Sequence, residues 1–345
     1  MIEPTRGNIL TDDSEALVNT VNCVGVMGKG IALQFKKAFP ENFKAYEAAC
    51  RREEVKPGRM FVFETGEMFN PRYIINFPTK RHWREKSRYE DIESGLPALV
   101  QEVRERKIRS IAIPPLGSGL GGLQWRRVKT MIVTAFEDIP DARVKLYEPE
   151  GSPDAKDMPV GTTKPKMTVA RAVLIKLMNQ YNRFAYRLTL LEIQKLAYFL
   201  QESGMDLKLR YVKHLYGPYA HNLNKVLEIL EGHHIRGYGD TQKPDVEISL
   251  LPDADKAADH FLQQAPDATA HLEKVADLVD GFETPYGMEL LASVHWATVH
   301  DGEASDAESA IAAMARWNDR KRRLFKPEHI RLAWKRLQTE GWIGV

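Results

Sequence analysis

The chain has 345 residues, of which 49 are basic and 47 acidic, so its formal net charge is +2. Hydrophobic residues make up 43% and charged residues 28%, an ordinary globular composition that argues against wholesale disorder, while the length predicts two domains. Long apolar runs free of charge and a secretory leader are both lacking, and two cysteines are too few for a disulfide scaffold. We therefore expect a cytoplasmic protein with no membrane partner.

The first 150 residues alternate short β-like runs with helical patterns. Strands are predicted at 16–21, 59–63, 73–77, 110–113 and 143–147, and helices at 31–38, 43–52, 89–106 and 125–137. Such alternation predicts an α/β layer fold with a mostly parallel sheet. In sheets of this kind ligands lie beyond the carboxyl ends of the strands, in the loops that lead into helices.

A stretch rich in Pro, Gly, Asp and Lys follows and reads as a linker, so we expect domains at 1–150 and 167–345 with a linker at 151–166. The second domain should be mainly α-helical, with Thr189 and Ser305 as helix N-caps. Its helices are predicted at 169–181, 190–201, 220–231, 257–264, 270–281, 288–299, 307–317 and 327–340, and its strands at 209–214 and 246–251.

The near-zero net charge hides opposed regions. Residues 251–308 hold 2 basic and 13 acidic residues, a net charge of −11, whereas residues 309–345 hold 9 and 3, a net charge of +6. Residues 1–150 and 151–250 have net charges of +3 and +4. The acidic block is either a solvated helical face or an acidic surface presented to a basic partner.

Two glycine-rich loops lie in the first domain, each between a predicted strand and a predicted helix. The first, residues 18–32, is not a nucleotide-triphosphate loop, because only two residues separate Gly25 from Gly28-Lys29 and Gly30 stands where Ser or Thr is required. The second spans 114–125. One such loop is equally consistent with a plain turn, but two in one α/β unit favour a pyrophosphate site.

The segments GNIL at 7–10, VNCVGVMGKGIALQFK at 21–36 and PPLGSGLGGLQW at 114–125 resemble the signature segments of macrodomains, which bind ADP-ribose. Together with Pro78-Thr79-Lys80 they resemble the branch that contains the terminal-ADP-ribose glycohydrolases and the DarG antitoxins of DarTG toxin–antitoxin systems. The resemblance covers residues 1–150 and implies a three-layer α/β/α macrodomain with a mixed sheet. The second domain is similar to DarG in size and position, and LEIQKLAYFLQ and HLYGPYAHNL resemble a helical antitoxin-associated domain.

The resemblance implies an enzyme that removes ADP-ribose from thymidine in single-stranded DNA and binds the cognate DNA ADP-ribosyltransferase toxin through residues 167–345. Asn8 stands where many macrodomains have Asp, and Gly121 stands where the terminal-ADP-ribose glycohydrolases carry a catalytic Asp. The residues implied to bind ADP-ribose are Asn8 and Ile9 near the adenine, Asn22, Val24, Gly25, Met27, Gly28, Lys29, Gly30 and Ile31 around the diphosphate and distal ribose, and Ser118, Gly119, Leu120 and Gly121 over the phosphates.

Lys80 matches the catalytic lysine of that branch. A lysine with a lowered pKa can attack the anomeric carbon of the ribose, and a protonated one can act as an acid on the leaving base or bind phosphate as a point charge. From the residues alone, a lysine in a solvated basic loop is the alternative. The spacing of His, Cys and Asp predicts no metal ligands, so we expect a metal-independent site with no cofactor.

The basic run after Lys80 is a candidate DNA contact. Its cations can neutralise phosphates, and an interleaved aromatic can stack on an unpaired base. The alternative is a basic loop with Trp83 packed inside. The DNA-binding candidates are Arg81, His82, Trp83 and Arg84.

A competing function also remains at this stage. It is a reader that holds ADP-ribose without hydrolysis and carries a helical DNA-binding regulatory domain. Gly121 in place of the acid favours the reader, and Lys80 after Pro78-Thr79 favours the enzyme.

Overall fold

The computed structural model describes residues 1–149, 158–182, 187–239 and 246–344. Contacts divide the chain into two compact units, residues 1–164 with 239–242 and residues 165–238 with 243–345. Of the expected linker, residues 151–157 lie outside the described residues, and the boundaries at 150 and 167 stay predictions.

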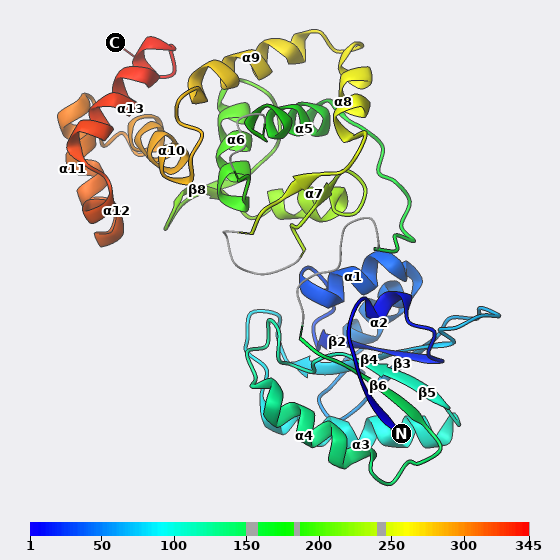
Figure 1. Cartoon of the computed structure of the whole chain (residues 1–345). Coiled ribbons are helices and arrows are strands. Elements are labelled where there is room, and N and C mark those ends of the chain that lie inside the picture. Colours follow the sequence, from blue (N-terminus) through cyan, green and yellow to red (C-terminus); the bar gives the residue numbers. More distant parts are fainter. Residues whose placement is uncertain (150–157, 183–186, 240–245, 345) are drawn as a thin grey trace. The chain divides into compact units, whose positions relative to one another are not determined.

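Six strands form the sheet of the first unit in the order β1-β6-β5-β2-β4-β3 (Figure 1). Neighbouring strands are parallel except for β3, which runs antiparallel to β4. This confirms the expected mixed sheet. The strands are β1 (Ile2–Thr5), β2 (Ala16–Asn22), β3 (Phe61–Glu64), β4 (Tyr73–Lys80), β5 (Ser110–Ile113) and β6 (Arg143–Tyr147).

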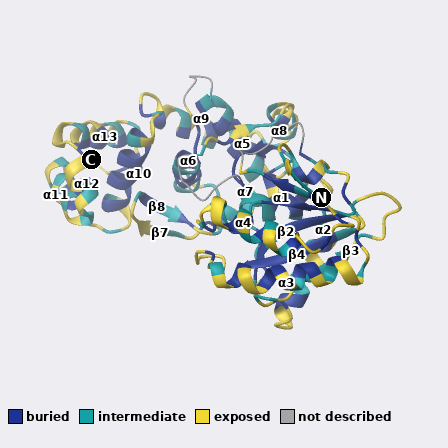
Figure 2. Ribbon diagram, turned by 60° about the horizontal axis from the view of Figure 1, so that its bottom comes forward, coloured by how far each residue is buried: buried dark blue, intermediate teal, exposed yellow. Residues whose placement is uncertain are grey.

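Helices cover both faces of this sheet. Because side chains alternate along a strand, Ala16 and Val18 of β2 pack in the core that α3 and α4 share, whereas Leu17 packs with Phe35 of α1 on the other face. Burial on both faces explains why the first three residues of β2, Ala16 to Val18, are all apolar, and Figure 2 shows the central strands buried. The helices are α1 (Gly30–Ala38), α2 (Pro40–Arg51), α3 (Tyr89–Glu105) and α4 (Trp125–Phe136).

Two strands of the first unit differ from the predictions. β1 was not expected from the short segment IEPT, and among the described residues it is an edge strand that pairs with β6. β4 continues beyond the predicted 73–77 through Pro78 to Lys80, which becomes its last residue. The strand tolerates Pro78 because the pairing with β2 shifts at this point, from Val21 opposite Pro78 to Asn22 opposite Lys80.

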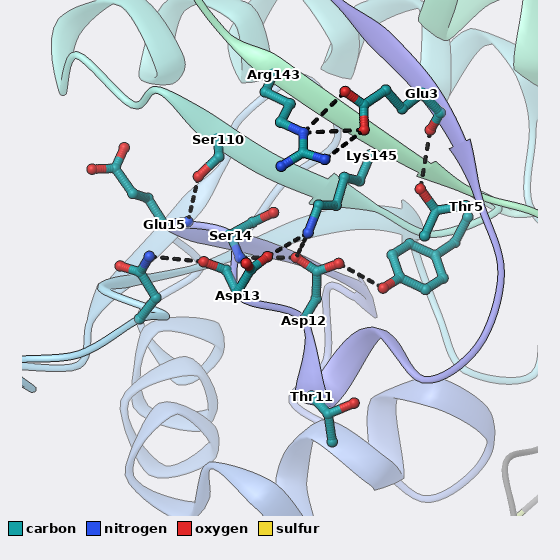
Figure 3. A network of polar contacts seen from close by, with 12 residues as sticks. Glu3, Thr5, Thr11, Asp12, Asp13, Ser14, Glu15, Ser110, Arg143 and Lys145 are labelled. Carbon is teal, nitrogen blue, oxygen red and sulfur yellow. Dashed lines mark hydrogen bonds and ion pairs between the residues drawn. The ribbon is translucent and has the colours of Figure 1, made fainter.

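A polar network fastens the short 3-10 turn η1 (Ile9–Thr11) to β6 (Figure 3). The Asp12 carboxylate accepts hydrogen bonds from the Ser14 amide at 2.8 Å, the Tyr147 hydroxyl at 2.6 Å and the Lys145 ammonium at 3.1 Å. Burial by itself would raise the pKa of Asp12, but these hydrogen bonds outweigh it and hold the pKa below its ordinary value. The segment that carries Asn8 and Ile9 is therefore anchored.

The second unit is mainly helical, as expected. Its few strands pair as the hairpin of β7 (Tyr211–His214) with β8 (Gly217–Ala220) and as β9 (Ile235–Arg236) with β10 (Ser249–Leu250). The helix α10 is buried along most of its length. The helices are α5 (Val169–Asn182), α6 (Leu190–Glu202), α7 (Leu223–Leu230), α8 (Ala254–Leu262), α9 (Asp267–Val279), α10 (Pro285–Val299), α11 (Ala307–Trp317), α12 (Asp319–Leu324) and α13 (Pro327–Thr339).

The cap at Thr189 is confirmed, because Thr189 and Glu192 form a capping box. The cap at Ser305 is wrong: the carboxylate of the next residue, Asp306, accepts from the Ser309 amide at 2.7 Å and caps α11. The helix predicted at 220–231 begins only at Leu223, since 217–220 pair with β7 instead. The short basic helix α12 was not predicted. Among the described helices, none has the length and apolar character needed to cross a bilayer.

Folding pairs much of the acidic block with basic residues. Lys321 in α12 has no exposed surface and donates to Glu289 of α10 at 2.7 Å, so opposite charges from the acidic block and the basic tail meet in the core. Other acids of the block that form ion pairs are Asp253, Asp255, Asp259, Asp301, Glu303 and Glu308. The exposed acids of the block with no ion pair within the described residues are Asp306, whose carboxylate caps α11, and Asp267, Glu273, Asp277 and Asp280, which lie on or directly after α9.

We expect Asp12→Asn to lower the free energy of unfolding by about 1–3 kcal/mol at pH 7, because it removes a buried acceptor of charged and neutral donors. Urea unfolding measures this loss. Since the folded state lowers the pKa of Asp12, its stabilisation is present above the ordinary pKa of 3.8 and fades as the pH falls below it. The free energies of unfolding of wild type and Asp12→Asn should therefore become equal in acid. Asp13→Asn is the control, because Asp13 also contacts Lys145 but its side chain is 85% exposed. Equal losses in both variants would contradict the anchoring role of Asp12.

Candidate active site

The carboxyl ends of β2 and β4 lie side by side, and the chain leaves both strands in hydrogen-bonded contact. Asn22, the last residue of β2, pairs in register with Lys80, the last residue of β4. One residue further on, the Cys23 amide donates to the Arg81 carbonyl at 3.2 Å. Because β5 is parallel to β2 on its other side, the second glycine loop also leaves from this edge. The two loops and Lys80 therefore converge.

The side chain of Asn22 organises the first loop. Its carboxamide oxygen accepts from the Val24 amide at 3.0 Å and the Val26 amide at 3.3 Å, and its nitrogen donates to the Val26 carbonyl at 2.5 Å. The buried Tyr46 hydroxyl of α2 donates to the Asn22 carbonyl at 2.6 Å. The implied contact of Asn22 with ribose stays a prediction, while the structure places its carboxamide against the loop backbone.

The rest of the first loop presents backbone more than side chains. Gly25 has a φ of +78° and packs against α2, where a Cβ would meet Glu47 and Cys50 at 3.5 Å. Met27 is 1% exposed, so its side chain belongs to the core. Val24 is 46% exposed. The remaining predicted residues, Gly28, Lys29, Gly30 and Ile31, lead into the first turn of α1, with Lys29 at the N-cap and Ile31 packed against the core.

The second loop folds into consecutive tight turns. The Ser118 amide donates to the Pro115 carbonyl, the Gly122 amide to the Gly119 carbonyl and the Leu123 amide to the Gly117 carbonyl, each at 3.0 Å. The loop also touches the first one: a Cβ on Gly30 would lie 2.9 Å from the Leu120 side chain. Glycine at position 30 is thus required twice, for this contact and for its φ of +59°.

Lys80 connects β4 to the second loop. Its ammonium group donates to the Leu120 carbonyl at 2.8 Å. The side chain is half-buried, and this burial lowers the pKa of Lys80 because the charged form loses solvation. A larger fraction of neutral amine at a given pH favours a nucleophile, and a lowered pKa also favours proton donation. The structure therefore places the predicted lysine where both loops meet.

Gly121 leaves no space for the carboxylate that the terminal-ADP-ribose glycohydrolases carry at this position. A Cβ there would lie 2.2 Å from the Ser87 hydroxyl oxygen and 2.3 Å from the Gly117 carbonyl oxygen. Cys23, whose thiol donates to the Lys80 carbonyl at 3.4 Å, does not replace this carboxylate as a reactive group, since burial raises the pKa of the thiol to about 11. Lys80, whose pKa is lowered by burial, stays the candidate catalytic group.

At the other end of the expected ligand site, Asn8 caps η1. Its side-chain oxygen accepts from the Leu10 amide at 3.0 Å, and its amide nitrogen lies 3.6 Å from the Met158 sulfur. Ile9 is 6% exposed and packs in the core beside α1. Their contact with adenine stays a prediction, and the Asp12 network holds both residues in place.

The basic segment after Lys80 divides into two parts. Arg81 is paired, because its guanidinium donates to the buried carboxylate of Asp91 in α3 at 3.0 Å. His82, Trp83 and Arg84 form an outward group instead: Trp83 is 39% exposed, its ring lies 5.4 Å from that of His82, and Arg84 lies 4.6 Å from its centroid. The alternative of Trp83 packed inside does not describe this structure.

Sequence reasoning missed two residues that shape the site. Tyr46 reads as an ordinary core position in the pattern of α2, and nothing in its spacing indicates that its hydroxyl reaches Asn22. Ser87 lies at the end of the basic segment, and only the fold brings it against Gly117 and Gly121. A small residue among larger basic ones was the sole available signal.

Comparisons with known proteins show which family the chain resembles. The family model for the Macro domain matches residues 18–132. A "DNA ADP-ribosyl glycohydrolase" of Thermus aquaticus is 50% identical over 99% of this chain and 94% of its own length. A solved structure, "Macrodomain of Thermus aquaticus DarG", is 56% identical, covers 43% of this chain and 99% of its own, and has a TM-score of 0.42. A "DNA ADP-ribosyl transferase-DNA ADP-ribosyl glycohydrolase fusion protein" of Thermosipho africanus is 33% identical over 42% of this chain and 41% of its own.

The two glycines at 119 and 121 provide a matched test of the second loop. Gly121→Ala should weaken binding of ADP-ribose, the ligand that the resemblance implies, by roughly tenfold or more, because its Cβ forces the loop to move. Gly119→Ala should bind within about twofold of wild type, since nothing lies within 4 Å of a Cβ there and its φ is not positive. Calorimetric titration measures both. Equal affinities would show that the close packing around Gly121 is not required.

Proposed function

The chain belongs to the DNA ADP-ribosyl glycohydrolase family, and we propose that it cleaves its substrate with Lys80 at the junction of its two glycine loops. The protein is a glycohydrolase that releases ADP-ribose from DNA. The observation that carries the proposed role of Lys80 is its hydrogen bond of 2.8 Å to the Leu120 carbonyl. This bond holds an amine of lowered pKa at the point where both loops meet.

ADP-ribose is proposed to lie along the carboxyl edge of the sheet. The Gly30 amide at the start of α1 donates to the Gly239 carbonyl at 2.5 Å, so the proposed donors to the diphosphate are the next amides of the first turn of α1 and those of the second loop that its turns do not use. Asn8 with Ile9 lies at the adenosine end. In this arrangement the distal ribose reaches the end of β4. The anomeric carbon, whose bond to the base is broken, then lies next to Lys80.

Lys80 has two possible roles in breaking this bond. As a neutral amine it attacks the anomeric carbon, a carbon–nitrogen bond forms, and the electron pair of the broken glycosidic bond leaves with the base; water later releases the ribose. As an ammonium group it gives a proton to the leaving base while water attacks. Burial of Lys80 supports both roles, because each benefits from a pKa nearer to neutrality.

Single-stranded DNA with a modified thymidine is the proposed substrate. Trp83 offers an exposed ring on which an unpaired base can stack, and Arg84 beside it offers charge to a phosphate. Both follow Lys80 within four residues. Arg81 contributes less, because its guanidinium is paired with Asp91. A duplex would hide the base edges and faces that this group can reach.

The second unit is proposed to bind the toxin that places ADP-ribose on DNA. The Thermosipho relative is named as a fusion of transferase and glycohydrolase, which supports a functional link between the two activities. A DNA-modifying toxin requires a basic groove for its substrate. The exposed acids on α9, which form no ion pair within the described residues, suit such a groove electrostatically.

The reader hypothesis, with a DNA-binding helical domain, is not supported. The basic tail that suggested DNA binding is largely engaged inside the second unit, since Lys321 and Arg320 pair with Glu289 and Arg331 pairs with Glu308. Full-length similarity to a named glycohydrolase favours the enzyme.

We expect Lys80→Ala to lower release of ADP-ribose from ADP-ribosylated single-stranded DNA by at least about a thousandfold, while its affinity for free ADP-ribose changes by less than about tenfold. Chromatography of the released nucleotide and calorimetric titration measure the two quantities. Lys56→Ala is the control, since Lys56 is an exposed lysine in the loop before β3. Substantial release by Lys80→Ala would refute its catalytic role.

The α9 surface is tested in full-length Lys80→Ala protein, which can inhibit the toxin only by binding it. Adding Glu273→Gln, Asp277→Asn and Asp280→Asn should weaken toxin inhibition by roughly tenfold at low salt, because complementary charge is lost. The matched triple Asp253→Asn, Asp259→Asn and Glu308→Gln changes the net charge equally but affects acids already paired within the unit. Its inhibition should stay within about threefold. Equal losses would reject α9 as the interface, and absence of inhibition by Lys80→Ala itself would reject toxin binding.

A further inference from the structure

Ser87 occupies an unusual position in the site. It is 6% exposed, and within the described residues its hydroxyl oxygen has no hydrogen-bond partner. It lies between two glycines of the second loop, where a Cβ on Gly117 would come within 3.0 Å of its Cβ and one on Gly121 within 2.2 Å of its oxygen. Serine therefore fills the space that both glycines leave open.

The backbone of Ser87 is bound to the same loop. Its amide donates to the Gly121 carbonyl at 3.0 Å. The ammonium group of Lys80 donates to the preceding carbonyl, that of Leu120, at 2.8 Å. Two consecutive carbonyls of the second loop thus hold the two ends of one segment, Lys80 at its start and Ser87 at its end.

This double attachment links three parts of the site. Leu120 accepts from Lys80 through its carbonyl and touches the first loop through its side chain, at the position of Gly30. Movement of Gly121 would therefore shift the acceptor that fixes Lys80. The residues between the two attachments include Trp83 and Arg84. Nucleic acid bound at these residues would therefore affect the positions of the Leu120 and Gly121 carbonyls.

We propose that Ser87 is a positioning residue for Lys80. Its Cβ packs closely against both glycines, within 3.0 Å of a Cβ on Gly117 and 2.8 Å of one on Gly121, and its amide binds the Gly121 carbonyl, so that the Leu120 carbonyl is held at the lysine. Ser87 does not touch the reacting atoms in this proposal. The inference deepens the proposed function and rests on Lys80 as the catalytic group. It also assigns a reason for glycine at position 121, since this space belongs to Ser87.

The test compares full-length Ser87→Val with Ser87→Ala. Valine replaces the hydroxyl with a methyl group and adds a second methyl group at the crowded Cβ. It should lower kcat on ADP-ribosylated single-stranded DNA by at least about tenfold, since small displacements of a catalytic group are costly. Alanine keeps the amide donor and the Cβ and loses only an unpartnered hydroxyl. Its kcat should stay within about threefold of wild type.

A pH–rate profile separates positioning from general destabilisation. A displaced Lys80 loses its burial, so its pKa rises toward the ordinary 10.5. In either proposed role of Lys80, the limb of the profile that reports its titration then moves to higher pH in Ser87→Val and not in Ser87→Ala. A variant that is only less stable, with a lower melting temperature, would keep this limb at the wild-type pH.

The outcomes decide the proposal. Wild-type kcat in Ser87→Val, or a lowered kcat with an unmoved limb, would overturn the positioning role while the glycohydrolase activity stands. Wild-type protein that releases no ADP-ribose would overturn the proposed function and this inference together. If Ser87→Val does not fold, Ser87→Thr, which keeps the hydroxyl and adds one methyl group, is measured in the same way and decides by the same criteria.

Discussion

Parallel pairing of β5, β2 and β4 is the constraint on which the site depends. Parallel strands direct their carboxyl ends to the same edge, so the loops after β2 and β5 and the last residue of β4 must meet. Lys80 then bonds to the Leu120 carbonyl across 40 residues of sequence. A lysine elsewhere on the strand would point into one of the two helix-covered faces, where its charge would have no comparable acceptor.

The site is built largely from backbone, and close packing makes this possible. Gly30 lets the first loop touch Leu120, and Gly121 leaves room for Ser87. Side chains hold this backbone in place. Asn22 and Tyr46 fix the first loop, and the Asp12 network anchors the segment that carries Asn8. Such an arrangement suits a ligand with a diphosphate, because amide groups fixed in position bind anions without reorganisation.

Charge is used differently in the two units. In the second unit many opposite charges cancel within the fold, and the Glu289–Lys321 pair does so in the core, where an unpaired ion would be costly. What folding leaves uncompensated on α9 is a smaller surface than the net charge of −11 suggests. In the first unit the outward group at Trp83 and Arg84 serves the proposed nucleic-acid substrate, and Arg81 serves the attachment of its own segment to α3.

The sequence by itself determined the α/β class of the first unit, the helical class of the second and both glycine loops, and it singled out Lys80 as a candidate. These follow from local periodicity, from glycine spacing and from signature segments, which are properties of neighbouring residues. It could not reveal α12, because six mostly charged residues carry no apolar period, nor the edge strand β1. Only the tertiary structure decided that Asn22 turns toward its own loop, that Arg81 is paired, that Lys321 is buried and that Ser87 fills the space at Gly121. Each of these depends on which side chains and backbone groups the packed fold leaves within reach of one another, and no pattern along the chain encodes that.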